Sequence, residues 1–207
     1  MLFPGSGKTT FCARLIKSQK WMLNRPADRI VYFYTELNEE IKKISKMDLV
    51  EVVKFFNQDI IDDWTAESGH MVIFVDDHLN ENIYDRLADV YAVKSRSKFI
   101  SIVLITQNQF TKSGNAARWN RTILLNSTLS ILFCNKRDQS LVSQVGRTAF
   151  QGRFRFFMDS YKTICDSDQG GHKYLAIFSD PSTPKFCELR TKIFFKTEVT
   201  ILFWPRK

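Results

Sequence analysis

The residues best suited to chemistry lie near the start of the chain, which reads Gly5-Ser6-Gly7-Lys8-Thr9-Thr10. Glycines let the backbone turn so that successive N–H groups face phosphate oxygens. Lys8 would add a positive charge beside those phosphates, and a threonine hydroxyl such as that of Thr9 is a ligand for Mg²⁺. We therefore predict a phosphate-binding loop for a nucleoside triphosphate with magnesium, formed by Gly5, Ser6, Gly7, Lys8, Thr9 and Thr10.

The loop departs from the full G-x-x-x-x-G-K-[ST] spacing. Its first glycine would fall at position 2, which is Leu2, and only residues 1–3 precede the loop where a buried strand is usual. We expect the missing strand and glycine to lie upstream of Met1, so that the first strand is truncated. The alternative is an ordinary helix N-terminus without a nucleotide.

A second chemical feature is the apolar run 71–75, which ends in Asp76-Asp77. A carboxylate at the end of such a strand holds Mg²⁺ through water, which is the expected role of Asp76 beside Thr9. Asp77, one residue on, would orient and deprotonate the attacking water. Alternatively, the two acids only cap the next helix, but their position downstream of the loop lysine favours the Walker B interpretation.

The next apolar run, 99–105, ends in Thr106-Gln107-Asn108. An amide at the tip of a strand beside the Walker B strand can hydrogen-bond the terminal phosphate or the water. Gln107 is therefore predicted as a catalytic sensor, together with Lys8 and Asp77. Candidates for DNA-phosphate contacts or, among the arginines, for an arginine finger acting across a subunit interface follow: Lys112, Arg118, Arg121, Arg137 and Arg147.

The elements that must position these residues alternate between strand and helix. Short runs rich in β-branched and aromatic residues, without period-two alternation, are typical of parallel strands buried on both faces; they are 30–34, 71–75, 99–105, 129–133 and 174–178. Helix-like segments are 9–24, 39–56 and 82–94. This order predicts a three-layer α/β fold with a mostly parallel central sheet.

The chain of 207 residues fits a single domain, 1–207. We expect an α/β core over 1–150 and a C-terminal extension over 151–207 that ends in a small β appendage, with strands at 193–195 and 199–204. The longest apolar run is far shorter than the ~20 residues of a membrane helix, and Lys8 interrupts any leader-like run. A secreted or membrane protein is therefore not expected.

Charge is unevenly distributed along a chain whose formal net charge is +8. Residues 36–91 contain 14 acids and 5 bases, whereas residues 94–155 contain 11 bases and one acid. This concentration favours an anion-binding surface, although a solvated basic face is the plain alternative.

The remaining titratable residues predict no site. Four cysteines are far apart and are interpreted as reduced thiols rather than a disulfide or zinc framework: Cys12, Cys134, Cys165 and Cys187. The three histidines are too scattered for a metal site and are expected to be structural: His70, His78 and His172.

Taken together, the loop, the strand ending in Asp-Asp and the strand ending in Thr-Gln-Asn resemble a viral genome-packaging ATPase of the HerA–FtsK superfamily. The segments Arg-Thr-Ile-Leu-Leu-Asn at 121–126 and Phe-Cys-Asn-Lys-Arg-Asp at 133–138 add to the resemblance, as do 174–175 and 189–194. It covers nearly the whole chain and is nearest to the polinton/Maverick and adintovirus enzymes, with poxvirus-type packaging ATPases more distant.

The resemblance implies a RecA-like P-loop NTPase fold of the ASCE type with ATP and Mg²⁺ as cofactors. It implies a homo-oligomeric ring, hexameric in relatives, that threads double-stranded DNA of any sequence into a preformed capsid. The expected location is the host nucleus or the site of virion assembly. Within the family pattern, Lys8 and Thr9 match the nucleotide loop, Asp76 and Asp77 the Walker B acids, and Gln107 the sensor. Two departures are the absent first glycine, which leaves the activity of this chain open, and residues 95–98, where a histidine-containing stretch is expected.

Two other functions remain open from the sequence. A small nucleoside or nucleotide kinase has a similar length and an early P-loop, although no arginine-rich lid is evident. An inactive remnant that binds DNA without hydrolysis would agree with the incomplete loop.

Overall fold

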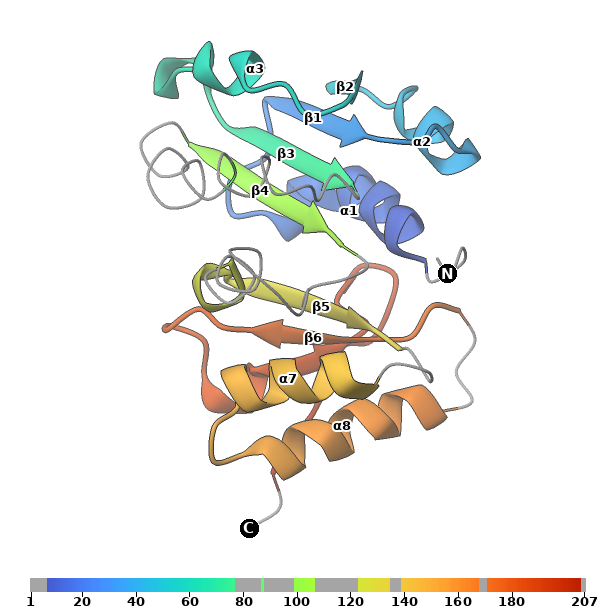
Figure 1. Ribbon diagram of the computed structural model, residues 1–207, viewed down its shortest axis with the longest axis vertical. Helices are drawn as coiled ribbons and strands as arrows, with labels where there is room; N and C mark the ends of the chain where they lie inside the picture. The colour runs from blue at the N-terminus through green and yellow to red at the C-terminus, as the bar shows by residue number, and fades with distance from the viewer. Residues whose placement is uncertain are drawn as a thin grey trace. The chain divides into compact units, whose positions relative to one another are not determined.

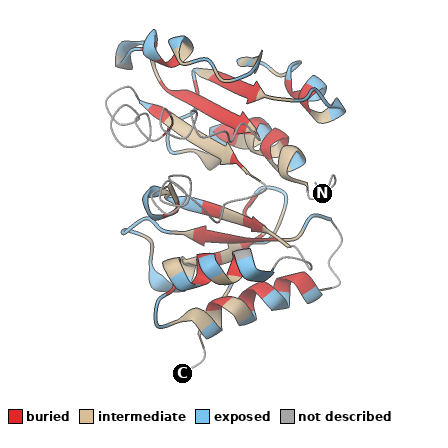
Figure 2. Cartoon of the chain, in the orientation of Figure 1, coloured by how far each residue is buried: buried red, intermediate tan, exposed pale blue. Residues whose placement is uncertain are grey.

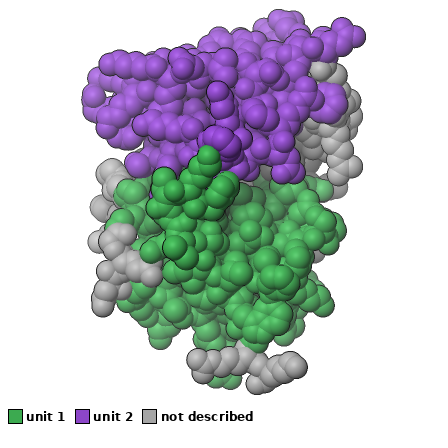
Figure 3. All heavy atoms as spheres, turned by 180° about the vertical axis from the view of Figure 1, so that it is seen from behind, with its two compact units in different colours: residues 1–7, 120–207 green, residues 8–119 purple. Residues whose placement is uncertain are grey.

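The computed structural model describes residues 7–76, 87, 99–106, 123–134, 139–167 and 171–205. The chain forms two compact units, which Figure 3 shows in different colours. Residues 8–119, purple in Figure 3, form the parallel-sheet unit. Residues 1–7 and 120–207, green in Figure 3, form the antiparallel-sheet unit.

The parallel-sheet unit is built on four strands in the order β2-β1-β3-β4, all parallel (Figure 1). They are β1 (Arg29–Tyr34), β2 (Val50–Lys54), β3 (Met71–Asp76) and β4 (Ile100–Ile105). Tyr34 lies opposite Asp76, and Asp76 lies opposite Ile105. The strands predicted at 30–34, 71–75 and 99–105 are confirmed, and their carboxyl ends meet at one edge.

Both faces of this sheet are covered, as the uninterrupted apolar strands predicted. On one face Tyr32 and Phe74 pack with α1 (Lys8–Met22) and α2 (Glu39–Ile44). On the other face Phe33 and Ile73 pack with α3 (Asp59–Asp62) and Trp64. Figure 2 shows β1 and β3 as largely buried. The result is an α/β arrangement with the core split between the two faces of the sheet.

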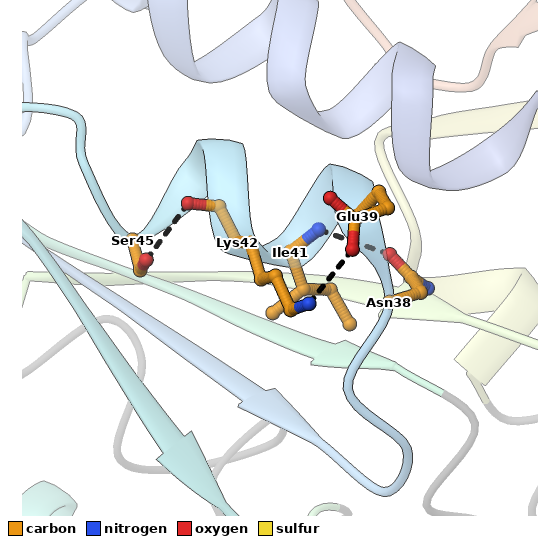
Figure 4. A network of polar contacts seen from close by, with 5 residues as sticks. All are labelled: Asn38, Glu39, Ile41, Lys42 and Ser45. Atoms are coloured by element: carbon orange, nitrogen blue, oxygen red, sulfur yellow. Dashed lines mark hydrogen bonds and ion pairs between the residues drawn. The ribbon is translucent and has the colours of Figure 1, made fainter.

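The short helix α2 begins with a side-chain cap, drawn in Figure 4. Asn38 has an extended backbone, and its Oδ1 accepts a hydrogen bond from the N–H of Ile41 at 2.9 Å. Glu39 pairs with Lys42 at 2.7 Å on the exposed side, a contact worth little in water. Ile41 and Ile44 are buried, so packing rather than surface charge holds this helix.

The helix predicted over 39–56 is wrong beyond residue 44. α2 stops at Ile44, a turn follows, and Leu49 takes φ +66, which cannot continue a helix. The next residues form β2, which is an edge strand of the four-stranded parallel sheet. Three valines in five residues favour a strand over a helix there, because β-branched side chains are restricted in helices. Of the helix predicted over 82–94, only Leu87 lies within the described residues; it is helical and buried.

His70 is a structural residue, as expected. It is buried, and its Nδ1 and Nε2 lie 2.9 Å from the carbonyl oxygen of Arg25 and 2.8 Å from the hydroxyl of Ser101. Its backbone N–H donates to Asp28 at 2.7 Å. These bonds satisfy a buried polar side chain at the edge where β3 begins.

The antiparallel-sheet unit has strands in the order β5-β6-β7-β8. They are β5 (Leu129–Phe133), β6 (Tyr174–Phe178), β7 (Leu189–Thr191) and β8 (Ile201–Leu202), with helices α7 (Gln139–Ala149) and α8 (Phe154–Asp166) between β5 and β6 in the chain (Figure 1). The strands predicted at 129–133 and 174–178 are confirmed, but a parallel pairing for them is wrong, since β5 and β6 pair antiparallel. A strand at 193–195 is also wrong, because β7 ends at Thr191, whereas β8 lies inside 199–204.

Helices α7 and α8 approach each other closely at Gly146. A Cβ at this position would lie 2.4 Å from the ring of Phe157, so a larger residue would displace that ring. Phe157 is fully buried and stacks on Phe150, with ring centroids 5.2 Å apart. Tyr161 then donates a hydrogen bond to the carbonyl of Phe133, which fixes α8 to the end of β5.

Cys134 and Cys165 form a disulfide, which corrects the expectation of four reduced thiols. Cys134 directly follows β5 and Cys165 lies in the last turn of α8, with their Cα atoms 5.5 Å apart. The sequence did not predict this disulfide because the two cysteines are 31 residues apart, and it is the packing of α8 beside β5 that brings them together. Cys12 and Cys187 are free.

We expect reduction of this disulfide to lower the free energy of unfolding by about 3 to 4 kcal/mol, because a loop of 31 residues is no longer closed in the unfolded chain. Urea unfolding with and without dithiothreitol measures the change. Cys134→Ser is the control, since its unfolding should not respond to the reductant. Equal midpoints for the oxidised and reduced wild-type protein would contradict the pairing.

Candidate functional site

The candidate site lies at the carboxyl edge of the parallel sheet. Asp76 is the last residue of β3 and is half-buried. Lys8 and Thr9 are the first two residues of the 15-residue helix α1, which packs through Cys12 and Ile16 against the face of the sheet that carries Tyr32. Gly7 precedes the helix with φ +82, a conformation that glycine adopts without strain. The N-terminus of α1 and the end of β3 both belong to the parallel-sheet unit.

One hydrogen bond orients the carboxylate of the second sequence motif. The Tyr32 hydroxyl donates a hydrogen bond to Oδ2 of Asp76 at 2.7 Å. Tyr32 lies on the face of the sheet against which α1 packs, and α1 begins at Lys8 and Thr9. The two motifs, predicted from the sequence to share a magnesium ion, are therefore both associated with this face of the sheet.

The Cys12 thiol is influenced by the charges of both Lys8 and Asp76. The Cys12 thiol, one turn into α1, is buried, and burial raises its pKa far above the usual range. The negative charge of Asp76 raises this pKa further, and the positive charge of Lys8 opposes the rise. Both charges thus act on one thiol beneath the N-terminus of α1.

Tyr32 is likewise held in its protonated form. Burial is the main cause that raises the pKa of its hydroxyl far above the usual range, and the negative charge of Asp76 and the hydrogen bond to Asp76 raise it further. The Thr9 side chain acts in the opposite direction. The hydroxyl therefore remains a donor to the carboxylate at neutral pH.

The backbone at the end of β3 has its own support. The Thr35 hydroxyl donates to the carbonyl oxygen of Asp76 at 3.4 Å, from the residue that follows β1. Because β1 and β3 pair in register up to Tyr34 and Asp76, the carboxylate is placed by the sheet itself.

These groups fit a magnesium-bound triphosphate in their chemistry. A hydroxyl and a carboxylate are the hard oxygen ligands that Mg²⁺ takes, usually from one or two protein groups together with phosphate oxygens. Lys8 and the N-terminus of a 15-residue helix both favour an anion. Within the described residues no group of three or more His, Cys, Asp or Glu side chains could hold a metal, so a metal ion here would depend on the oxygens of its partner ligand.

Of the remaining predicted residues, the structure describes Thr10 and Arg147. Thr10 is exposed in the first turn of α1. The other predicted contacts lie outside the described residues: Gly5, Ser6, Asp77, Gln107, Lys112, Arg118, Arg121 and Arg137. Arg147 lies in the last turn of α7, with its guanidinium 4.9 Å from the ring centre of Phe154. Of the predicted site residues, the structure thus describes Lys8, Thr9, Thr10 and Asp76 within the parallel-sheet unit.

Sequence reasoning missed Tyr32 and Cys12. The signal for Tyr32 is its hydroxyl within the otherwise apolar centre of the run 30–34, on the strand next to the one that ends in Asp76. Cys12 carries no such signal, because a small buried thiol in an amphipathic helix is an ordinary core residue.

Comparison with protein-family models, with curated proteins and with solved structures finds no match to this chain. In the part of the chain that the structure describes, none of the helices has the length and apolar character needed to cross a membrane.

The two free cysteines should differ in reactivity. Cys12 is buried and its raised pKa keeps it as a thiol, whereas Cys187 is partly exposed. At pH 8, N-ethylmaleimide should therefore modify Cys187 in the native protein and reach Cys12 only after unfolding, as peptide mass spectrometry would show. Cys187→Ser, the control, should remain unmodified while native. Rapid native labelling of Cys12 would contradict a site closed beneath the helix.

Proposed function

We propose that this chain is an ATPase that binds magnesium and ATP at the N-terminus of α1 and uses hydrolysis to move double-stranded DNA into a capsid. The observation that carries the nucleotide part is the hydrogen bond from the Tyr32 hydroxyl to Asp76, on the face of the sheet that α1 covers. Two motifs far apart in the sequence, the start of α1 and the end of β3, each suited to the same ligand, thus belong to one side of the parallel sheet.

The chemistry of the described groups supports distinct roles in binding. Lys8 and the backbone N–H groups at the start of α1 would bind phosphate oxygens, and Thr9 and Asp76 would hold Mg²⁺. Bound magnesium would neutralise charge that develops on the phosphates. From their places in the sequence, Asp77 would take a proton from the attacking water and Gln107 would orient that water.

The DNA part of the proposal rests on sequence. The basic segment 94–155 and the resemblance to packaging ATPases support binding to phosphates without reading bases. A homo-oligomeric ring, hexameric as in the relatives, with double-stranded DNA and capsid proteins as partners, in the nucleus or at the site of virion assembly, completes the proposal.

Lys8→Ala should lower ATP hydrolysis at least about 100-fold, because it removes the positive charge expected at the terminal phosphates. Steady-state phosphate release measures this loss. The matched control is Lys17→Ala, an exposed lysine on the same helix, which should keep full activity. Equal losses in both variants, or none in either, would contradict a nucleotide site at the start of α1.

Loss of the positive charges at Lys112 and Arg118 should reduce DNA-stimulated hydrolysis more than basal hydrolysis. The double variant Lys112→Ala/Arg118→Ala is compared with Lys42→Ala/Lys43→Ala, which removes the same charge from the exposed surface of α2. ATP turnover is measured with and without double-stranded DNA, and with a nucleoside as a second additive. Stimulation by the nucleoside instead of DNA would favour a kinase. An equal fall in the basal and the DNA-stimulated rates of hydrolysis would show that these residues do not couple DNA binding to hydrolysis.

A further inference from the structure

We propose that Tyr32 is a positioning residue, which orients the Asp76 carboxylate so that it binds magnesium with the nucleotide. This inference rests on the proposed function, since it concerns the same site. It assigns a role to a side chain that belongs to neither motif and that would not itself contact the nucleotide.

The ring of Tyr32 is held rigidly. Its side chain is fully buried, and β1 pairs on both sides at this point, with Val52 of β2 and Phe74 of β3 opposite Tyr32. The rings of Tyr32 and Phe74 stack with centroids 5.5 Å apart and an interplanar angle of 15°. A tyrosine fixed in this way presents its hydroxyl at one place, so the carboxylate that accepts its hydrogen bond is also fixed.

The direction of the hydrogen bond between Tyr32 and Asp76 suits a metal site. Tyr32 gives its proton to Oδ2 of Asp76, which orients the carboxylate without withdrawing its charge. An ionised carboxylate accepts at about four lone-pair sites, so one bond from Tyr32 is compatible with binding a cation or its water. Without the Tyr32 hydroxyl, the orientation of the carboxylate would not be preset.

The proposal predicts a defect that depends on the metal. Tyr32→Phe keeps the ring and its packing and removes only the hydroxyl. Compared with wild type, it should need about tenfold more Mg²⁺ for half-maximal nucleotide binding, the effect of losing one hydrogen bond to a charged group. The affinity for ATP in EDTA, which reports Lys8 and the helix N-terminus, should stay within twofold.

Binding of a fluorescent ATP analogue, titrated with Mg²⁺ and repeated in EDTA, gives both quantities without reference to turnover. Mn²⁺ titrated in the presence of ATP and followed by electron paramagnetic resonance reports metal affinity directly. The matched control is Tyr34→Phe, which removes a hydroxyl from the same strand and the same face, packed against the same core cluster. It should leave the Mg²⁺ requirement unchanged.

The outcomes separate this inference from the function on which it rests. If wild type binds no nucleotide with or without Mg²⁺, the proposed function is wrong and the inference fails with it. If wild type binds and Tyr32→Phe shows an unchanged Mg²⁺ requirement, only the inference is overturned. Equal losses with Mg²⁺ and in EDTA, a matching shift in Tyr34→Phe, or loss of cooperative unfolding in Tyr32→Phe would show a structural role and would also overturn it.

Discussion

The hydrogen bond between the Tyr32 hydroxyl and the Asp76 carboxylate, 2.7 Å long, is the interaction on which the candidate site depends. It exists because β1 and β3 are parallel and in register, so that residues near their carboxyl ends lie side by side. α1, which begins at Lys8 and Thr9, packs on the face that carries Tyr32. A buried ring thus places a hydroxyl at the edge of the core, where it orients the carboxylate of Asp76.

The parallel sheet was predictable because its strands are buried on both faces and therefore lack alternation. β1, β3 and β4 are such runs, and their bounds agree with the sequence to within a residue. β2 was not predictable in this way. Its apolar residues also fit a helical spacing with Ile41 and Ile44, and only the left-handed turn at Leu49 separates helix from strand.

The antiparallel unit shows a different limit of sequence reasoning. β6 is nearly continuous in burial, like a parallel strand, yet it pairs antiparallel with β5 and β7. A strand that is buried on both faces indicates that both faces of its sheet are covered. It does not indicate whether the strand pairs parallel or antiparallel with its neighbours. In the site, the phosphate-binding loop and the acidic pair could be predicted because their residue types and spacing indicate a chemistry. Tyr32 could not be predicted, because its contact with Asp76 depends on how β1 and β3 pair, which spacing alone does not encode.

The disulfide between Cys134 and Cys165 changes how force would pass along this chain. It closes α7 and nearly all of α8 into a covalent ring of the polypeptide. Tension applied at the two chain ends would travel from β5 across the sulfur bridge to the segment that leads into β6, and the enclosed helices would stay slack. The antiparallel unit can therefore lengthen under load only by the residues outside that ring, for as long as the sulfurs remain joined.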